Sequence, residues 1–184
     1  MGKTLLSETA RWRYPPMPHR PGSFAAAGAV RPAVPADAGE ITRLRSEYVL
    51  AEPLGEEWLA VCREQLAERL DAGGDALAYV VDAPGGLAAC ALGLTHRVLP
   101  GPRYPRGLAA RIHVVATEPA YRRRGFARAA VSALLDRLQR DGVTLFELHA
   151  SDEAAPLYRE LGFAGDPALM RMTRLFPASA PGTS

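Results

Sequence analysis

The stretch from Val114 to Arg128 combines residue types that suit the binding of a phosphate group. An apolar run ends at Ala116, a short corner follows, and three arginines at 122–124 lead into Gly125 and a helical pattern. Backbone N–H groups at a helix N-terminus point outward, and the helix dipole favours negative charge there. Glycine lets the backbone approach a phosphate closely, and arginine side chains suit phosphate oxygens. The stretch therefore predicts a phosphate-binding turn, with a solvated basic turn before an ordinary helix as the alternative.

Two common nucleotide-binding loops do not fit this turn. The pattern GxxxxGK[ST] requires a lysine and a hydroxyl residue, which do not follow Gly125, and GxGxxG requires more glycines than the turn contains. The predicted phosphate would therefore be held by a loop of a different kind.

Length, composition and charge narrow the class of protein. A chain of 184 residues predicts one domain, and 48% hydrophobic residues are enough for a core. The formal net charge of +2 gives no reason to expect nucleic acid as a partner. Cys62 and Cys90 lie far apart without CxxC or histidine spacing, so we expect reduced thiols, no disulfide and no metal site.

The ends of the chain differ in composition from its middle. Residues 1–28 contain four prolines and no sustained period, so we expect a largely irregular N-terminal extension, and residues 176–184 form a tail. No apolar run has the length of a membrane span, and the N-terminal residues lack the apolar centre of a secretory signal. We therefore expect a domain at residues 29–175, located in the cytoplasm and without membrane contact.

Hydrophobic periodicity and turn residues predict ten elements in the order β-α-α-β-β-β-α-β-α-β, which is a mixed α/β sheet. The strands are expected at residues 30–33, 76–81, 87–96, 108–116, 143–148 and 168–174. The phosphate-binding turn would then connect the fourth strand to the third helix.

Four helices are expected between these strands. The first follows Asp37, which precedes Glu40 at the spacing of a capping box, and runs to about Val49. The third follows Gly125, and the fourth spans roughly residues 153–161. The second helix has an apolar face made of Trp58, Leu59, Cys62, Leu66 and Leu70. The residues of the third helix that we expect to be buried are Ala127, Ala130, Val131, Leu134 and Leu138.

Three local motifs follow one another in a specific order. The first is Arg122-Arg123-Arg124-Gly125-Phe126-Ala127, which fits R/Q-x-x-G-x-G/A, and the second is the strand end Val115-Ala116-Thr117 with Pro119 after it. The third is Ala154-x-x-x-Tyr158-x-x-x-Gly162-Phe163. Together with the element order, these motifs resemble the GNAT superfamily of N-acetyltransferases over residues 29–175. The resemblance implies a GNAT-like α/β fold, with a mixed, mostly antiparallel sheet and helices on both faces.

The resemblance also implies acetyl-CoA as the co-substrate. In that family, backbone N–H groups of the glycine-containing turn bind the pyrophosphate. The corresponding residues here are Arg122, Arg123, Arg124, Gly125, Phe126 and Ala127, with Arg128 at the edge. The pantetheine arm would pair like an extra strand with Val115, Ala116 and Thr117. Many relatives hold this arm with an asparagine where the present chain has Ser151, so this contact is in question.

Acetyl transfer to an amine needs a base for the amine proton and often an acid for the departing thiolate. The family usually supplies the acid as a tyrosine, and Tyr158 occupies that position. Glu147 and His149 alternate on one face of the preceding strand and are the two candidates for the base. His113 and Glu118 are weaker candidates, and a chain of water molecules would also serve.

Specificity for the acceptor should come from the first two helices and the long loop at 99–106. Tyr48, Glu52 and Glu56 lie where these helices meet, and an acidic lip there would favour a cationic amine. The alternative is a solvated helix start with carboxylates placed favourably for the helix dipole.

The sequence thus predicts an enzyme that transfers acetyl from acetyl-CoA to a primary amine of a small molecule or peptide. A CoA-binding module with weak catalysis and a regulatory role is the main alternative. An interaction protein that docks through residues 1–28 is a third reading, and a homodimer is one assembly that the resemblance allows.

Overall fold

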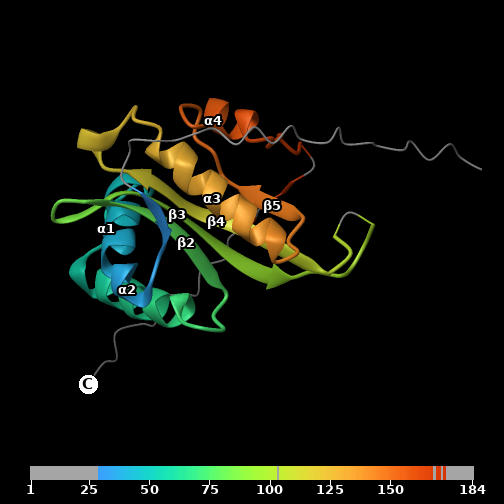
Figure 1. Ribbon diagram of the computed structural model, residues 1–184, viewed down its shortest axis with the longest axis horizontal. Helices are drawn as coiled ribbons and strands as arrows, with labels where there is room; N and C mark the ends of the chain where they lie inside the picture. The colour runs from blue at the N-terminus through green and yellow to red at the C-terminus, as the bar shows by residue number, and fades with distance from the viewer. Residues whose placement is uncertain (1–28, 103, 168, 171, 173–184) are drawn as a thin grey trace, which may run out of the picture.

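A computed structural model of the chain describes residues 29–102, 104–167, 169–170 and 172. A five-stranded sheet in the order β1-β2-β3-β4-β5 forms its centre (Figure 1). The strands are β1 (Val30–Pro32), β2 (Ala76–Ala83), β3 (Gly86–Arg97), β4 (Leu108–Thr117) and β5 (Leu145–Leu148). The helices are α1 (Ala38–Tyr48), α2 (Glu56–Leu70), α3 (Phe126–Arg140) and α4 (Ala155–Glu160), with 3₁₀ turns at Pro35–Asp37 and Pro119–Tyr121.

The pairing of the strands confirms a mixed, mostly antiparallel sheet. The first three neighbouring pairs are antiparallel, and β4 and β5 are parallel. The order of the first nine predicted elements is correct. The predicted strand at 168–174 lies largely outside the described residues. None of the described helices is long and apolar enough to cross a lipid bilayer.

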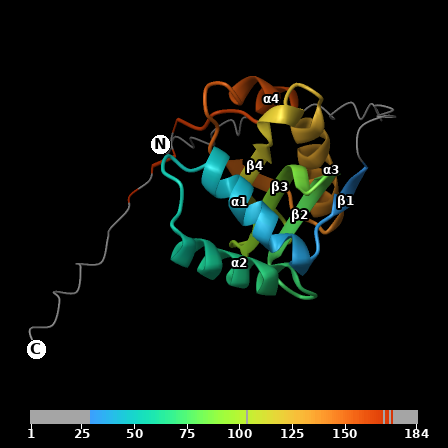
Figure 2. The ribbon, with the colours of Figure 1, turned by 90° about the vertical axis from the view of Figure 1, so that its left-hand side faces the viewer.

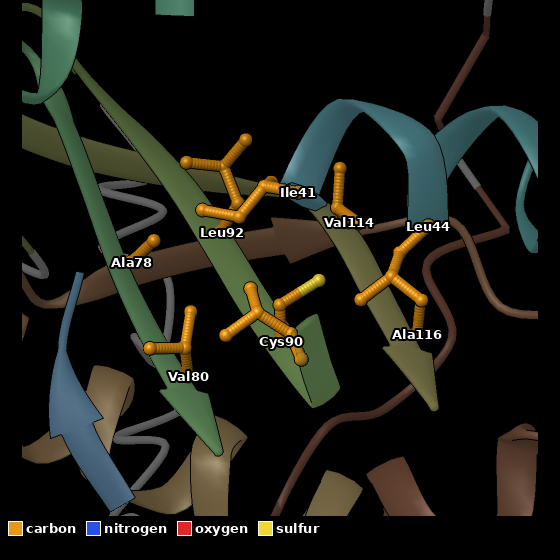
Figure 3. Packing of buried hydrophobic residues seen from close by; sticks show 9 residues of the cluster. Ile41, Leu44, Ala78, Val80, Cys90, Leu92, Val114 and Ala116 are labelled. Carbon is orange, nitrogen blue, oxygen red and sulfur yellow. The ribbon is translucent and has the colours of Figure 1, made fainter. Parts of the chain in front are cut away.

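Helices cover both faces of the sheet, as Figure 2 shows from the side. On one face, Ile41 and Leu44 of α1 pack against the strands (Figure 3). On the other face, α3 packs through four of the residues predicted to be buried, and Ala127 is half-buried. Full burial of a side chain such as Leu or Val stabilises the fold by about 1.5–3 kcal/mol relative to exposure. The residues that α3 buries on the sheet are Phe126, Ala130, Val131, Leu134 and Leu138.

The apolar face of α2 is only partly covered by the rest of the protein, and Trp58 on this face is 62% exposed. No residue of this helix is fully buried, and only Leu66 and Leu70 pack against the core on this side. The helix contacts α1, the turn before α1, and β2, so only a narrow edge of it meets the protein. The helical period identified a helix but not how much of its apolar side is covered.

The capping box predicted at the start of α1 is also wrong. The Asp37 carboxylate accepts hydrogen bonds from the Val34 N–H at 2.8 Å and from the Arg31 guanidinium at 2.8 and 2.9 Å. Glu40 instead accepts hydrogen bonds from Arg43 and the Leu87 N–H. Charge-assisted hydrogen bonds are stronger than those to a neutral donor, so the carboxylate of Asp37 binds Arg31 and does not cap α1, although Asp37 is its N-cap residue.

We expect Asp37→Asn to destabilise the fold at neutral pH. The Arg31 guanidinium holds the pKa of Asp37 below its usual value, with the Val34 N–H adding to this effect. A depressed pKa means that the stabilisation is present above the unfolded pKa, about 3.9, and is lost as pH falls towards the folded pKa. Urea unfolding should show a loss of about 1.5–3 kcal/mol at pH 7 that shrinks in acid.

Asp152→Asn is the matched control, because Asp152 is exposed and forms no hydrogen bond or ion pair with the described residues. A pH-independent loss at Asp37, or an equal loss at Asp152, would show that the Arg31 ion pair does not stabilise the fold.

Candidate active site

The ladder between β4 and β5 is shorter than β4 itself. It pairs Ala109 with Leu145 and ends where Ile112 pairs with Leu148. The strand β4 continues to Thr117, so its last residues have no strand partner on this edge among the described residues. Unpaired backbone groups at a strand edge can accept an extended ligand as an additional strand. This part of β4 includes Val115, Ala116 and Thr117, the residues expected to bind pantetheine.

A bulge lies beside the point where the ladder ends. On the β3 side, Leu92 pairs with Val114 and Gly93 pairs with Ile112, which leaves His113 without a partner in the ladder. The extra residue changes which face the side chains occupy: Ile112 packs in the α3 cluster and Val114 in the α1 cluster. Such bulges re-aim side chains beside functional sites. The sequence pattern alone did not reveal this one.

The turn before α3 has the backbone geometry of an anion-binding site. Gly125 has φ +81° and caps the helix, and Arg123 also has a positive φ of +63°. The first hydrogen bond of the helix runs from the Ala129 N–H to the Gly125 carbonyl at 3.0 Å. The N–H groups of residues 123–128 donate no hydrogen bond to other described residues. Successive N–H groups in a turn and at a helix start form a concavity that favours anions.

The space next to Gly125 is open. A Cβ atom added to this residue would meet no atom within 4 Å, and the four residues 122–125 are exposed. A ligand could therefore approach the backbone at this point without displacing a side chain.

The arginines of the turn contact nearby parts of the protein. The Arg122 guanidinium lies 5.8 Å from the ring centroid of Tyr48, and that of Arg124 lies 5.3 Å from the ring of Tyr121. Arg128 forms an ion pair with Glu160, which joins the first turn of α3 to α4. The guanidiniums of Arg122 and Arg124 are thus held at the rim of the turn by cation–π contacts.

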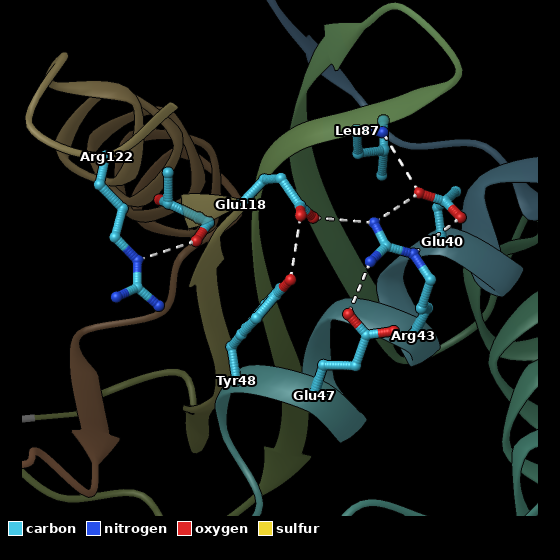
Figure 4. Close-up of polar contacts among 8 residues, drawn as sticks. Glu40, Arg43, Glu47, Tyr48, Leu87, Glu118 and Arg122 are labelled. Carbon is cyan, nitrogen blue, oxygen red and sulfur yellow. Dashed lines mark hydrogen bonds and ion pairs between the residues drawn. The ribbon is translucent and has the colours of Figure 1, made fainter. Parts of the chain in front are cut away.

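A network around Glu118 connects the end of β4 to α1 (Figure 4). The Tyr48 hydroxyl donates to one Glu118 oxygen at 2.9 Å, and Arg43 donates to the other at 3.1 Å. Arg43 also pairs with Glu40 and Glu47. Burial and the Glu118 carboxylate raise the pKa of Tyr48. The hydroxyl of Tyr48, a residue expected at the acceptor site, therefore donates its hydrogen bond to Glu118.

Tyr158 lies on α4 with only 7% of its surface exposed. Its ring packs edge-on against Phe163, with centroids 5.9 Å apart, and burial raises the pKa of its phenol. Ser151 accepts the Ala154 N–H on its hydroxyl at 3.3 Å and the Ala155 N–H on its carbonyl. Ser151 therefore holds the start of α4, and its contact with pantetheine stays a prediction.

The two predicted bases differ in their surroundings. Glu147 is the register partner of Arg111, and its carboxylate forms no hydrogen bond or ion pair with the described residues. His149 is exposed, and its Nε2 contacts the Arg111 guanidinium. Since a guanidinium can only donate, this contact uses the lone pair that a base needs. Arg111 was not singled out from the sequence.

The predicted acidic lip is fully solvated. Glu52 and Glu56 are exposed and form no hydrogen bond or ion pair with the described residues. Their role at the acceptor site stays a prediction. The role of Arg43 in the Glu118 network was also not predicted from the sequence. Its spacing to Glu40 and Glu47, three and four residues away, is that of ion pairs along a helix.

Known proteins share both the sequence pattern and the fold. The sequence profile of the acetyltransferase (GNAT) family matches residues 41–163. No curated protein matches the chain.

Several solved structures have this fold. A predicted acetyltransferase with acetyl-CoA from Clostridium acetobutylicum is 18% identical, with a TM-score of 0.70 over 79% of this chain and 95% of that one. A GCN5-related N-acetyltransferase from Ralstonia eutropha JMP134 is 22% identical, with a TM-score of 0.65 over 79% and 97%. A glucosamine-6-phosphate N-acetyltransferase from Arabidopsis thaliana is 18% identical, with a TM-score of 0.62 over 81% and 98%. The family profile covers well over half of the chain, so the chain belongs to the acetyltransferase (GNAT) family, whose members transfer acetyl groups from acetyl-CoA.

Proposed function

We propose that this protein transfers an acetyl group from acetyl-CoA to a primary amine of a small molecule or peptide. The observation that carries the proposal is the open turn at Gly125 beside the unpaired end of β4. The turn offers N–H groups to a diphosphate, and the strand edge offers peptide groups to the amide-containing pantetheine arm.

The buried hydroxyl of Thr117 also fits the binding of acetyl-CoA at this site. The Thr117 hydroxyl is buried and has no hydrogen-bond partner among the described residues, although it lies at the unpaired end of β4. Native proteins satisfy almost all buried polar groups, so an orphaned group at a strand end suits a site completed by a polar ligand. Residues 123–128 supply the donors for phosphate oxygens.

The chemistry needs two proton transfers. The neutral amine attacks the thioester carbonyl, a C–N bond forms, the C–S bond breaks, and the sulfur leaves as a thiolate. Tyr158 gives its phenolic proton to that sulfur, while a base takes the proton that the amine nitrogen loses. Burial raises the pKa of Tyr158, so the phenol stays protonated at neutral pH and can act as the acid.

Glu147 is the better candidate for the base. Its carboxylate has no partner among the described residues, whereas His149 offers its Nε2 lone pair to Arg111. We expect Glu147→Gln to lower kcat about tenfold, which is less than a typical general base contributes because water can replace it. His149→Gln should lower kcat less than threefold, roughly. Steady-state rates for both variants test this, and a larger loss at His149 would reverse the assignment.

Calorimetry with acetyl-CoA, followed by a thiol-release assay with a panel of amines, tests the proposal itself. Binding of acetyl-CoA and release of CoA with at least one amine are the expected results. Binding without thiol release across the panel would instead support a CoA-binding module with weak catalysis. Absence of acetyl-CoA binding at millimolar concentration would overturn the proposal.

A further inference from the structure

A cluster of basic side chains lies on the α1–α2 face of the sheet, at the junction of β4 and β5. Its members are Arg45, Arg111, His113 and His149, which we call the basic cluster. Arg111 precedes Ile112, which packs on the α3 side, so alternation places Arg111 on the opposite face. The contact between Arg111 and His149 joins two members of the cluster directly.

Charged groups from several elements act on His113. Burial lowers the pKa of His113, and the positive charges of Arg111, Arg45 and Arg69 lower it further. The groups that face His113 therefore come from its own strand, from α1, from α2 and from the segment after β5. Glu147, the register partner of Arg111, supplies negative charge beside them.

Two of these arginines form no direct ion pair with a described carboxylate. Arg69 pairs with Asp75 at 2.6 Å. By contrast, Arg45 and Arg111 are half-buried and form no ion pair with any described Asp or Glu. Burying part of a guanidinium without a counter-charge costs free energy, so such groups commonly bind an anion.

The basic cluster is well placed for an acceptor. It lies where the β4–β5 ladder ends, beside Glu147, whereas the Gly125 turn lies beyond the other end of the unpaired part of β4. A molecule that presents its amine to Glu147 would have Arg45 and Arg111 within reach of its remaining groups.

We propose that the acceptor amine also carries an anionic group, a carboxylate or a phosphate, which Arg45 and Arg111 bind while the amine faces the acyl donor. The inference rests on the proposed acetyl transfer and narrows its substrate class. It differs from the cationic acceptor that the exposed Glu52 and Glu56 suggested.

Matched pairs of acceptors test this inference. Each pair is an amine with and without its anionic group: an amino acid and its carboxamide, or an amino sugar phosphate and the free amino sugar. We expect the anionic member to have a kcat/KM at least about tenfold higher, the size of one charge-assisted hydrogen bond. The carboxylate and phosphate pairs show which anion is preferred. Equal use of both members in every pair would overturn the inference while leaving acetyl transfer intact.

Substitutions locate the effect. Arg45→Gln and Arg111→Gln should each raise KM for the anionic member about tenfold and leave the neutral member unchanged. Arg111→Lys should retain most of the preference, because it keeps the charge. Arg140→Gln is the control, since Arg140 is exposed at the end of α3 on the other face. A preference that survives in both glutamine variants would also overturn the inference.

A measurement without turnover separates this inference from the proposed function. NMR titration of the His113 imidazole with inorganic phosphate should raise its pKa by about half a unit, because a nearby anion favours the charged form. The rise should vanish in Arg111→Gln. If acetyl-CoA does not bind but the rise occurs, the acyl-transfer proposal fails and the anion site stands. If no amine turns over and phosphate leaves the His113 pKa unchanged, the anion site is overturned.

Discussion

Gly125→Val should weaken acetyl-CoA binding at least tenfold, or about 1.4 kcal/mol. The native φ of +81° is costly for a residue with a Cβ, and valine is both bulky and β-branched. Its side chain would also enter the open space where the diphosphate is expected. Isothermal calorimetry with acetyl-CoA and with CoA measures the loss directly.

Gly73→Val is the matched control for backbone strain. Gly73 has φ +88° and equally open surroundings, but it lies in the turn between α2 and β2. Both variants should lose similar thermal stability, because the backbone conformation is the same. Only Gly125→Val should lose affinity, and an acetyl-CoA Kd within about twofold of the native value, roughly 0.4 kcal/mol, would show that the turn does not bind the cofactor.

Tyr158→Phe should lower kcat about 100-fold while leaving the Kd for acetyl-CoA unchanged. The phenylalanine ring keeps the edge-on packing against Phe163, so the variant loses the acid and little else. Because burial raises the pKa of Tyr158 above that of an ordinary tyrosine, the native enzyme should keep its acid protonated at neutral and mildly alkaline pH. Single-turnover rates across pH would separate the proton-transfer step from product release.

Tyr79→Phe is the control, since Tyr79 is a buried tyrosine of β2 that we place in no catalytic role. Its kcat should stay within about twofold. A Tyr158→Phe enzyme that is equally active would remove the phenol from the mechanism, and water would then have to protonate the thiolate.

Local sequence patterns predicted the elements well where the pattern reflects local forces. The helix α3 follows from apolar residues at helical spacing after Gly125, and four of the five residues expected to be buried there are buried. The phosphate-binding turn was predicted in the same way, because an arginine-rich turn before a helix is a local feature. Its observed backbone angles at Gly125 and Arg123 agree with that hypothesis.

Features that depend on distant partners were not predictable from such patterns. Asp37 had the spacing of a helix cap, but Arg31, held also by Asp82, binds its carboxylate more strongly. Tyr48 was expected at the acceptor site, and nothing in the sequence indicated that its hydroxyl donates to Glu118, which is 70 residues away. Trp58 lies on an apolar helix face of which only Leu66 and Leu70 pack against the core, and its own side chain stays largely exposed. In each case, the deciding group lies elsewhere in the chain.

The bulge at His113 has a further consequence for how the strand tolerates insertions and deletions. Ala110 and Ile112 before it pack in the α3 cluster, and Val114 and Ala116 after it pack in the α1 cluster. An uninterrupted ladder over the same number of residues would turn Val114 and Ala116 away from α1, whereas a chain shortened by this one residue would keep both of them on α1. Relatives without the bulge should therefore also lack one residue at this position of the strand.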